Sequence, residues 1–221
     1  LCALARYCFF TEYALICEED TAGLDAGLAA HPATPGDVAR LACYRPLAEH
    51  PDAATFGALS EEPVYRELID VTVRDPVHEK AIAARVVAVA PVTDAVSIRV
   101  QQQYEENPYP RWTTVGNGGP VSSDVARLAE RKRILVAGCG TGREAVDVSL
   151  IFPAARVDAI DLSRASLAYA TRKAAELGVG NVSFRQADIL DAARLGRDSC
   201  PRRRESGTFA PRFWRARTAT P

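Results

Sequence analysis

The feature of this sequence that most restricts its fold is a short loop of alternating glycines, Gly138-Cys139-Gly140-Thr141-Gly142. An apolar run at residues 134–137 precedes the loop, and a helical pattern follows it as far as Phe152. Glycines suit such a loop because the chain can turn sharply and a ligand can approach the backbone without meeting side chains. The free N–H groups at the start of the next helix point into the same space. The pattern predicts a ligand-binding turn, although an ordinary strand-to-helix turn would show the same glycines.

The alternation of strand and helix continues beyond this loop. We expect a second strand at 156–160, a helix from Ser163 to Leu177 that Gly178 and Gly180 close, and a third strand at 182–185. This order is typical of a parallel sheet with crossover helices. We therefore assign residues 122–195 to an α/β domain, of which the first half is present, truncated after the third strand.

Two acidic residues stand at strand ends. Asp161 ends the second strand, nineteen residues beyond Gly142, and Asp188 follows the third strand. An acid in the first position accepts hydrogen bonds from the ribose hydroxyls of an adenosine ligand. Adjacent strand ends line one crevice, so Asp188 could reach the adenine amino group. Asp161 could instead cap the next helix, although Ser163 already supplies a cap, and Asp188 could simply stabilise a turn.

Three segments resemble the cofactor-binding half of class I S-adenosylmethionine-dependent methyltransferases. They are Arg-Ile-Leu-Val-Ala-Gly-Cys-Gly-Thr-Gly at 133–142, Val-Asp-Ala-Ile-Asp-Leu-Ser at 157–163, and Gln-Ala-Asp-Ile-Leu-Asp at 186–191. The resemblance implies a Rossmann-like, doubly wound fold with S-adenosyl-L-methionine as cofactor. It implies that the cofactor contacts Gly138, Cys139, Gly140, Thr141, Gly142, Asp161, Leu162, Asp188 and Ile189.

The resemblance also implies a role for each part of this set. The three glycines would shape the methionine end of the site, Asp161 would hold the ribose and Asp188 the adenine, while Leu162 and Ile189 pack against the ring. The sequence departs from the family at Val136, where many members carry an acid two residues before the first glycine. An acceptor for the amino group of the ligand is therefore missing.

Residues 1–106 are expected to be helical. Apolar residues recur at three- and four-residue steps from Leu1 to Ile16. Further helices are expected at 37–47, at 60–73, from Asp75 through residue 89, and from Thr93 or Asp94 to Glu105 or Glu106. Residues 103–112 resemble a segment that precedes the methyltransferase domain in bacterial proteins with tetratricopeptide repeats. This second resemblance implies that the chain is a fragment that begins inside a helical repeat region.

Residues 107–121 are rich in proline and glycine and are expected to form a linker or lid, after which Ser122 or Ser123 caps a short helix. Tyr104, Tyr109 and Trp112 could cover a cofactor or could anchor this linker to the sheet. Cys139 is interpreted as a small residue in a tight loop, because no partner for nucleophilic catalysis can be assigned to it.

The last part of the sequence, residues 196–221, belongs to neither pattern. It contains seven arginines without apolar periodicity, at the point where a fourth strand should begin. A nucleic-acid-binding arm is one interpretation, and an out-of-frame translation of a GC-rich gene is the one we favour. Without further strands we expect the chain to be catalytically inactive and to have an uncovered sheet edge.

Composition excludes several other classes of protein. The net charge of −1 argues against nucleic-acid binding by the whole molecule. The longest apolar runs are too short for a membrane helix. Six irregularly spaced cysteines without a histidine cluster indicate a cytoplasmic protein with reduced thiols and no metal site.

We therefore predict methyl transfer from S-adenosylmethionine to an unidentified acceptor, with a further protein partner for the N-terminal helices. An NAD-type oxidoreductase fragment is the first alternative, but Arg143 stands where its third glycine should be. A non-enzymatic helical interaction module is the second.

Overall fold

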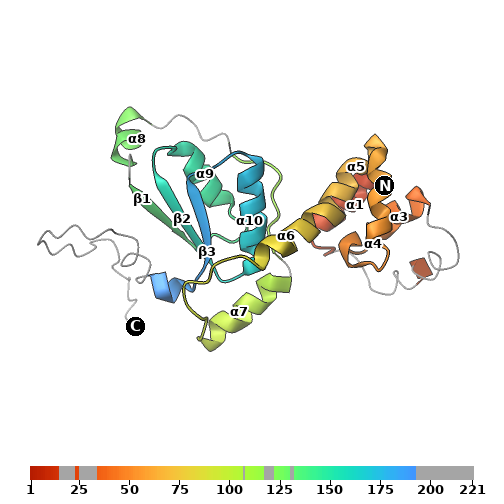
Figure 1. The fold of residues 1–221 in the computed structure, drawn as a ribbon, viewed down its shortest axis with the longest axis horizontal. Coiled ribbons are helices and arrows are strands. Elements are labelled where there is room, and N and C mark those ends of the chain that lie inside the picture. Colours follow the sequence, from red (N-terminus) through yellow and green to blue (C-terminus); the bar gives the residue numbers. More distant parts are fainter. Residues whose placement is uncertain (15–22, 25–33, 107, 117–121, 130–131, 193–221) are drawn as a thin grey trace, which may run out of the picture.

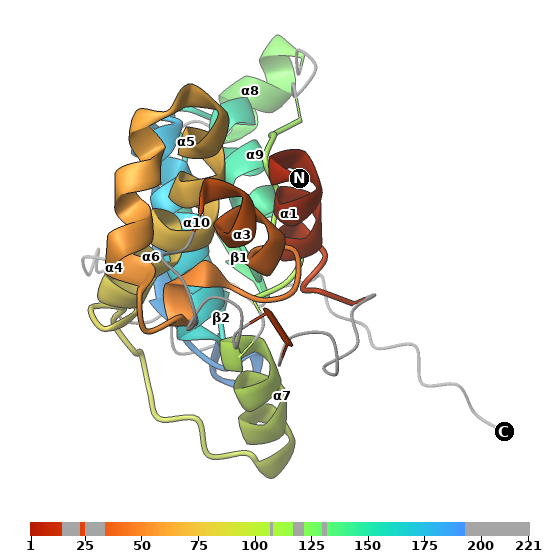
Figure 2. The ribbon, with the colours of Figure 1, turned by 90° about the vertical axis from the view of Figure 1, so that its right-hand side faces the viewer.

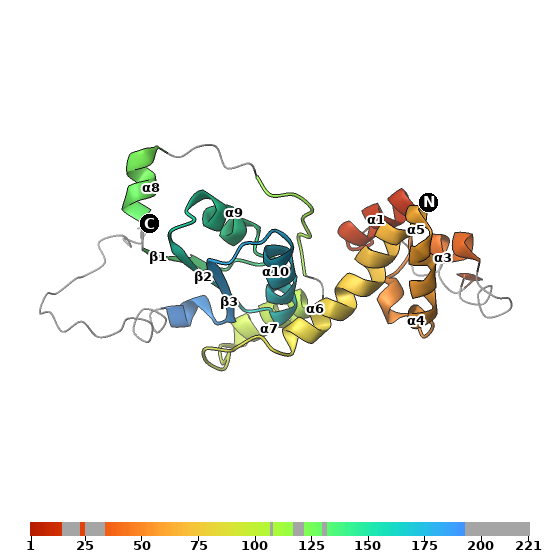
Figure 3. The same ribbon diagram turned by 45° about the horizontal axis from the view of Figure 1, so that its top comes forward.

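The computed structural model describes residues 1–14, 23–24, 34–106, 108–116, 122–129 and 132–192. The arginine-rich segment expected at 196–221 lies outside these residues. A group of N-terminal helices and an α/β part lie at opposite ends of the molecule, and helix α6 (Asp75–Ala83) runs between them (Figures 1 and 3).

Three parallel strands form the sheet, in the order β1-β2-β3. They are β1 (Arg133–Ala137), β2 (Arg156–Asp161) and β3 (Val182–Gln186), connected by α9 (Arg143–Ile151) and α10 (Arg164–Glu176). These elements lie within a residue or two of the predicted ones. The predicted fold class, a helical region followed by three strands of a Rossmann-like α/β sheet, is confirmed.

The two faces of the sheet differ in chemistry. On one face, Val136, Val157 and Ala159 form a core cluster with Ala145 of α9 and Leu167 of α10. On the other face, the Asp158 carboxylate is paired with the guanidinium groups of Arg133 and Arg185. Both connecting helices therefore cover the same apolar face, and the amino-terminal half of the opposite face is charged.

The outer edge of β3 is covered by an extended segment that we predicted to be helical. The N–H of Gln186 donates to the carbonyl of Val87, and the N–H of Val89 donates to the carbonyl of Gln186, both at 2.9 Å. The expected helix through residue 89 is therefore wrong, because α6 ends at Ala83. Valines 86, 87 and 89 favour an extended backbone. Among the described residues, β1 pairs only with β2.

The expected helices at 60–73 and from Asp75 form one continuous helical segment. Helix α5 (Pro63–Ile69) passes through a π-helical segment, η4 (Asp70–Arg74), directly into α6. Asp75 has right-handed helical φ and ψ, so the expected helix start at this residue is wrong. The π-helical turn stands immediately before Pro76, which lacks the N–H that a regular helix needs there.

The helices at the N-terminal end pack around one apolar cluster, and Figure 2 views them from that end. Besides α5 the group contains α1 (Cys2–Phe10), α3 (Pro35–Leu41), η2 (Leu47–Glu49), α4 (Ala53–Phe56) and η3 (Gly57–Glu61). Helix α1 is shorter than predicted, because Glu12 and Tyr13 have positive φ and interrupt it. Helix α3 starts earlier than predicted, because Thr34 and Asp37 form a capping box.

Two further helices flank the glycine-rich half of the chain. Helix α7 (Ala95–Glu106) is capped by Asp94, whose Oδ2 accepts the N–H groups of Val96 and Ser97. Helix α8 (Ser123–Ala129) precedes β1. Both were predicted. None of the described helices is long and apolar enough to cross a bilayer.

Candidate functional site

The glycine loop leaves the carboxyl end of β1 and is hydrogen-bonded to β2. The N–H groups of Gly138 and Cys139 both donate to the carbonyl of Ile160, at 2.9 and 3.0 Å. Gly138 and Gly140 have φ values of 72° and 51°, which residues with a Cβ rarely adopt. No described atom outside their immediate neighbours lies within 4 Å of a Cβ placed on either glycine. The loop is therefore open to an approaching ligand at these two positions.

Gly142 has a different reason to be glycine. A Cβ at this position would lie 2.3 Å from the Cβ of Ala170 in α10 and 3.1 Å from the ring of Phe184. Its φ is 82°, and α9 begins at the next residue. The structure therefore explains Gly142 by the close approach of the loop to α10, whereas the sequence suggested contact with a ligand.

Asp161 lies across from the glycine loop and is bonded to it. Its Oδ2 accepts the N–H of Gly140 at 2.8 Å, and its Oδ1 accepts the N–H of Ser163 at 3.0 Å. The hydroxyl oxygen of Ser163 caps α10 by accepting the N–H of Ser166. The helix cap is thus Ser163, as predicted. Each oxygen of Asp161 has a further lone pair for a ligand.

The second predicted acid lies at the adjacent strand end. Residues after β3 are held beside β2 because the N–H of Ala187 donates to the carbonyl of Asp161 at 3.0 Å. Asp188 is 5% exposed, and its Oδ1 accepts the N–H of Leu190 at 2.9 Å. Leu162 is half-buried and Ile189 is 57% exposed. Asp188 therefore stabilises a turn, one of the two alternatives for this residue. The contact of Asp188 with adenine stays a prediction, as do the contacts of Leu162 and Ile189 with the ring.

Cys139 is buried in the loop. Burial raises the pKa of its thiol well above the ordinary value, and the nearby charge of Asp161 raises it further. A thiol in this environment stays protonated at neutral pH and is a poor nucleophile. This agrees with the interpretation of Cys139 as a small residue in a tight turn.

Helix α7 contacts the segment that carries Asp161, which the sequence did not suggest. The two oxygens of Glu105 accept the N–H groups of Arg164 and Ala165, at 2.7 and 2.9 Å. The hydroxyl of Ser163 donates to the carbonyl of Tyr104 at 2.9 Å. An acid at the first turn of a helix is favoured by the helix dipole. The last turn of α7 thus fixes the start of α10 next to the predicted ribose acid.

The linker before the α/β part is also bound to the glycine loop. Trp112 is 5% exposed, and its indole N–H donates to the carbonyl of Thr141 at 2.8 Å. Thr141 donates its hydroxyl to the carbonyl of Pro110 at 2.6 Å. Tyr109 is 55% exposed and Tyr104 is 39% exposed. In this structure Trp112 occupies the anchoring role, one of the two alternatives left open for these aromatic residues.

A cleft of about 640 Å³ lies between the N-terminal helices, α6 and α7. The glycine loop does not line it. Its lining includes Phe9, Glu12, Val77, Glu105 and Arg111. Within the described part of the chain, no cluster of three or more histidine, cysteine or carboxylate side chains is placed to hold a metal ion.

Comparison with protein families connects this geometry to a class of enzyme. Residues 128–199 match a family model described as a methyltransferase domain. The matched range contains the glycine loop, Asp161 and Asp188. Residues 128–199 therefore carry the pattern of a methyltransferase domain.

Individual relatives match over limited lengths. The uncharacterized protein syc1184_c of Synechococcus sp. is 39% identical over 66 residues, which are 29% of this chain and 16% of that protein. Geranyl diphosphate C-methyltransferase from Streptomyces coelicolor A3(2), solved with S-adenosyl-L-homocysteine, is 21% identical, with a TM-score of 0.34. The match covers 46% of this chain and 50% of that one.

A solved structure concerned with converting a disulfide bond into a thioacetal group during echinomycin biosynthesis is 28% identical. Its TM-score is 0.31, with 44% of this chain and 42% of that one covered. The chain thus spans half or less of the length of these relatives.

Proposed function

We propose that this chain belongs to an enzyme that transfers a methyl group from S-adenosyl-L-methionine, and that residues 122–195 form its cofactor-binding half. The observation that carries the proposal is the family match over residues 128–199, which contains all the predicted site residues. The geometry supports it, because the open glycine loop and Asp161 lie together at the carboxyl edge of a parallel sheet. Ligands bind at this edge in open α/β sheets.

The residues present fit such a cofactor. Gly138 and Gly140 leave space against the backbone for the methionine part, and Asp161 can accept both ribose hydroxyls. When bound, the cofactor would supply a methyl group on a sulfonium sulfur, and a nucleophile that attacks this methyl carbon in line would displace S-adenosyl-L-homocysteine. The contribution of the chain is to hold the donor in a fixed orientation, which is how proximity lowers the barrier of such a reaction.

The acceptor and the catalytic residues are not assigned. The sequence predicts no strand after β3, and within the described residues β1 has no partner on its outer edge. Because further strands of the sheet are missing, we propose that residues 1–221 alone bind the cofactor without methylating an acceptor. The tetratricopeptide-repeat-associated type, a fragment of a longer protein and a cytoplasmic location belong to the same proposal. So does a protein partner for the N-terminal helices, where Leu1, Leu4 and Tyr7 are more than half exposed.

Calorimetric titration of the 221-residue chain tests the proposal. We expect S-adenosyl-L-homocysteine to bind and NAD⁺ to give no heat beyond dilution. Binding of NAD⁺ alone would favour the oxidoreductase alternative. Binding of neither by a folded chain would contradict the cofactor proposal and leave the helical interaction module as the better interpretation.

A further inference from the structure

Three consecutive linker residues, Pro110-Arg111-Trp112, connect the glycine loop with the N-terminal helices. Thr141 is bound by this segment on two sides, through its hydroxyl to Pro110 and through its carbonyl to the indole of Trp112. Thr141 is 3% exposed and Trp112 is 5% exposed, so water hardly competes for these hydrogen bonds. The position of the loop therefore depends on the position of the linker.

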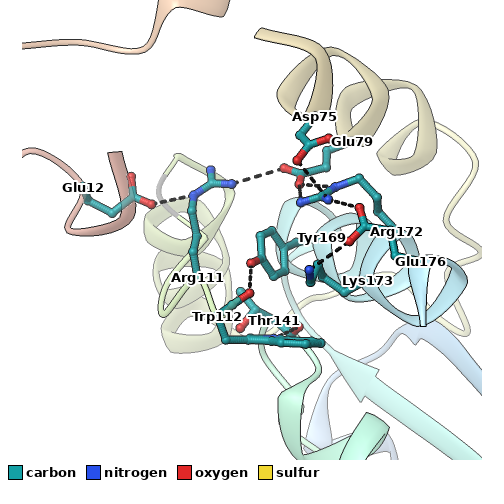
Figure 4. A network of polar contacts seen from close by, with 10 residues as sticks. All are labelled: Glu12, Asp75, Glu79, Arg111, Trp112, Thr141, Tyr169, Arg172, Lys173 and Glu176. Atoms are coloured by element: carbon teal, nitrogen blue, oxygen red, sulfur yellow. Dashed lines mark hydrogen bonds and ion pairs between the residues drawn. The ribbon is translucent and has the colours of Figure 1, made fainter. Parts of the chain in front are cut away.

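Arg111 connects the same segment to the helices on its other side (Figure 4). Its Nε donates to Glu12 Oε1 at 2.9 Å, and its Nη1 lies 3.3 Å from Glu79 Oε2. Glu12 follows α1, and Glu79 belongs to α6. The guanidinium carbon also lies 4.6 Å from the centre of the Phe9 ring. Arg111 thus binds two separate helical elements with one side chain.

Helix α10 also contacts Arg111 and Trp112 of the linker. The hydroxyl of Tyr169 donates to the carbonyl of Trp112, and the guanidinium of Arg111 lies 5.6 Å from the Tyr169 ring centre. Arg172 donates to Glu79 Oε1 at 2.8 Å. Glu79 is therefore shared by the arginine of the linker and an arginine of α10.

These contacts are buried, which makes their geometry specific. The side chains of Arg111 and Glu79 are 9% and 8% exposed, and that of Glu12 is 21% exposed. A buried guanidinium needs both partners in place, because an unpaired charge is costly away from water. Removing the charge of Glu12 or Glu79 should therefore free Arg111, and with it the linker, from the N-terminal helices, and not merely weaken one contact.

We propose that Arg111 is a positioning residue, which couples the N-terminal helices to the conformation of the glycine loop and so to cofactor affinity. This inference rests on the proposed function. With the linker released, Thr141 loses its fixed partners, and the cofactor must order the loop as it binds. The cost of that ordering appears as weaker binding. Because such coupling is reciprocal, bound cofactor should also stabilise docking of the helices.

The experiment compares Arg111→Met and Glu12→Gln with Glu67→Gln in the full chain. Glu67 is the control, because its carboxylate pairs with Arg6 of α1 inside the helical group and not with the guanidinium of Arg111. Two quantities are measured. They are the affinity for S-adenosyl-L-homocysteine and, without ligand, hydrogen exchange of the backbone amides at residues 138–142.

We expect Arg111→Met and Glu12→Gln each to weaken the binding of S-adenosyl-L-homocysteine about fivefold or more, the lower range of typical coupling between sites. Exchange at 138–142 should become faster in both, while Glu67→Gln stays close to the parent chain in both measurements. If Arg111→Met fails to fold, Glu12→Gln alone decides, since it keeps the size of the side chain.

The two proposals can fail separately. The parent chain could fail to bind S-adenosyl-L-homocysteine while amide exchange at 138–142 rises only in Arg111→Met and Glu12→Gln. In that case the loop-positioning role stands and the cofactor proposal fails. The inference is overturned if Glu12→Gln and Arg111→Met match Glu67→Gln in affinity and in loop exchange.

Discussion

The backbone N–H of Gly140 donates a hydrogen bond of 2.8 Å to Oδ2 of Asp161. These residues lie 21 positions apart in the chain, in the glycine loop after β1 and at the end of β2. The contact joins the two parts of the sequence that predicted a cofactor site. It also places a carboxylate directly beside the open backbone of Gly138 and Gly140.

Asp161→Asn should weaken binding of S-adenosyl-L-homocysteine about tenfold or more, because hydrogen bonds to a charged group contribute about 1.5–3 kcal/mol. Calorimetric titration measures the change. Asp158→Asn is the matched control, since Asp158 lies on the same strand and its carboxylate binds Arg133 and Arg185 instead. Equal affinities for the two variants would remove Asp161 from the site.

Gly142→Ala should lower the free energy of unfolding by about 3 kcal/mol or more, since overpacking adds to the cost of a left-handed backbone. Gly178→Ala serves as the comparison, because Gly178 has a φ of 67° and open space around it. That variant should lose only about 1–2 kcal/mol, the cost of the left-handed backbone alone. Urea denaturation distinguishes them, and similar losses would show that contact with Ala170 does not explain Gly142.

Glu105→Gln should lower the free energy of unfolding by about 1–2 kcal/mol, because a lost hydrogen bond adds to the effect of removing an acid from a helix N-terminus. The glutamine keeps one accepting oxygen but presents its NH₂ group to the second backbone N–H, so one of the two hydrogen bonds is lost together with the charge. Glu106→Gln changes the exposed neighbouring residue and should have little effect. Urea denaturation at low salt measures both, and a larger loss for Glu106→Gln would contradict the role of Glu105.

The carboxylate of Asp158 should make the stability of the fold depend on pH. Although burial opposes it, hydrogen bonds from Arg133 and Ser183 hold the pKa of Asp158 below its ordinary value. A depressed pKa in the folded state contributes stability above the unfolded value of about 3.9, and this stability is lost as pH falls through the folded value. In urea denaturation between pH 3 and 7, the free energy of unfolding should fall less at acid pH in Asp158→Asn than in the parent chain. Parallel curves for the two proteins would contradict this assignment.

Local patterns in the sequence were sufficient for much of the α/β part. The glycine loop, the three strands, the Ser163 cap and a helix start at Thr93 or Asp94 were predicted within a residue or two. Each depends on signals from neighbouring residues, such as a capping side chain or a glycine after an apolar run. The site assignments for Asp188, Leu162 and Ile189 stay predictions, since they concern a ligand.

Other features depend on how distant segments pack. The run at 86–89 was predicted to continue a helix, but its valines favour an extended backbone, and its pairing with Gln186 holds it in that form. Asp75 and Pro76 resemble a helix start, yet the chain passes through them as helix because α6 packs against α10. A local signal cannot resolve such cases, because tertiary contacts override propensities of this size.

Sequence patterns alone therefore predicted the glycine loop and the two acids at the strand ends, since backbone conformation and strand order follow from residues close together in the chain. The anchoring of that loop was decided only in three dimensions. Glu105 meets the start of α10 from 59 residues away, and Arg111 meets Glu12 from 99 residues away. Groups so far apart in the chain carry no shared periodicity or motif, and only the packing of the helices and the linker brings them within hydrogen-bond distance.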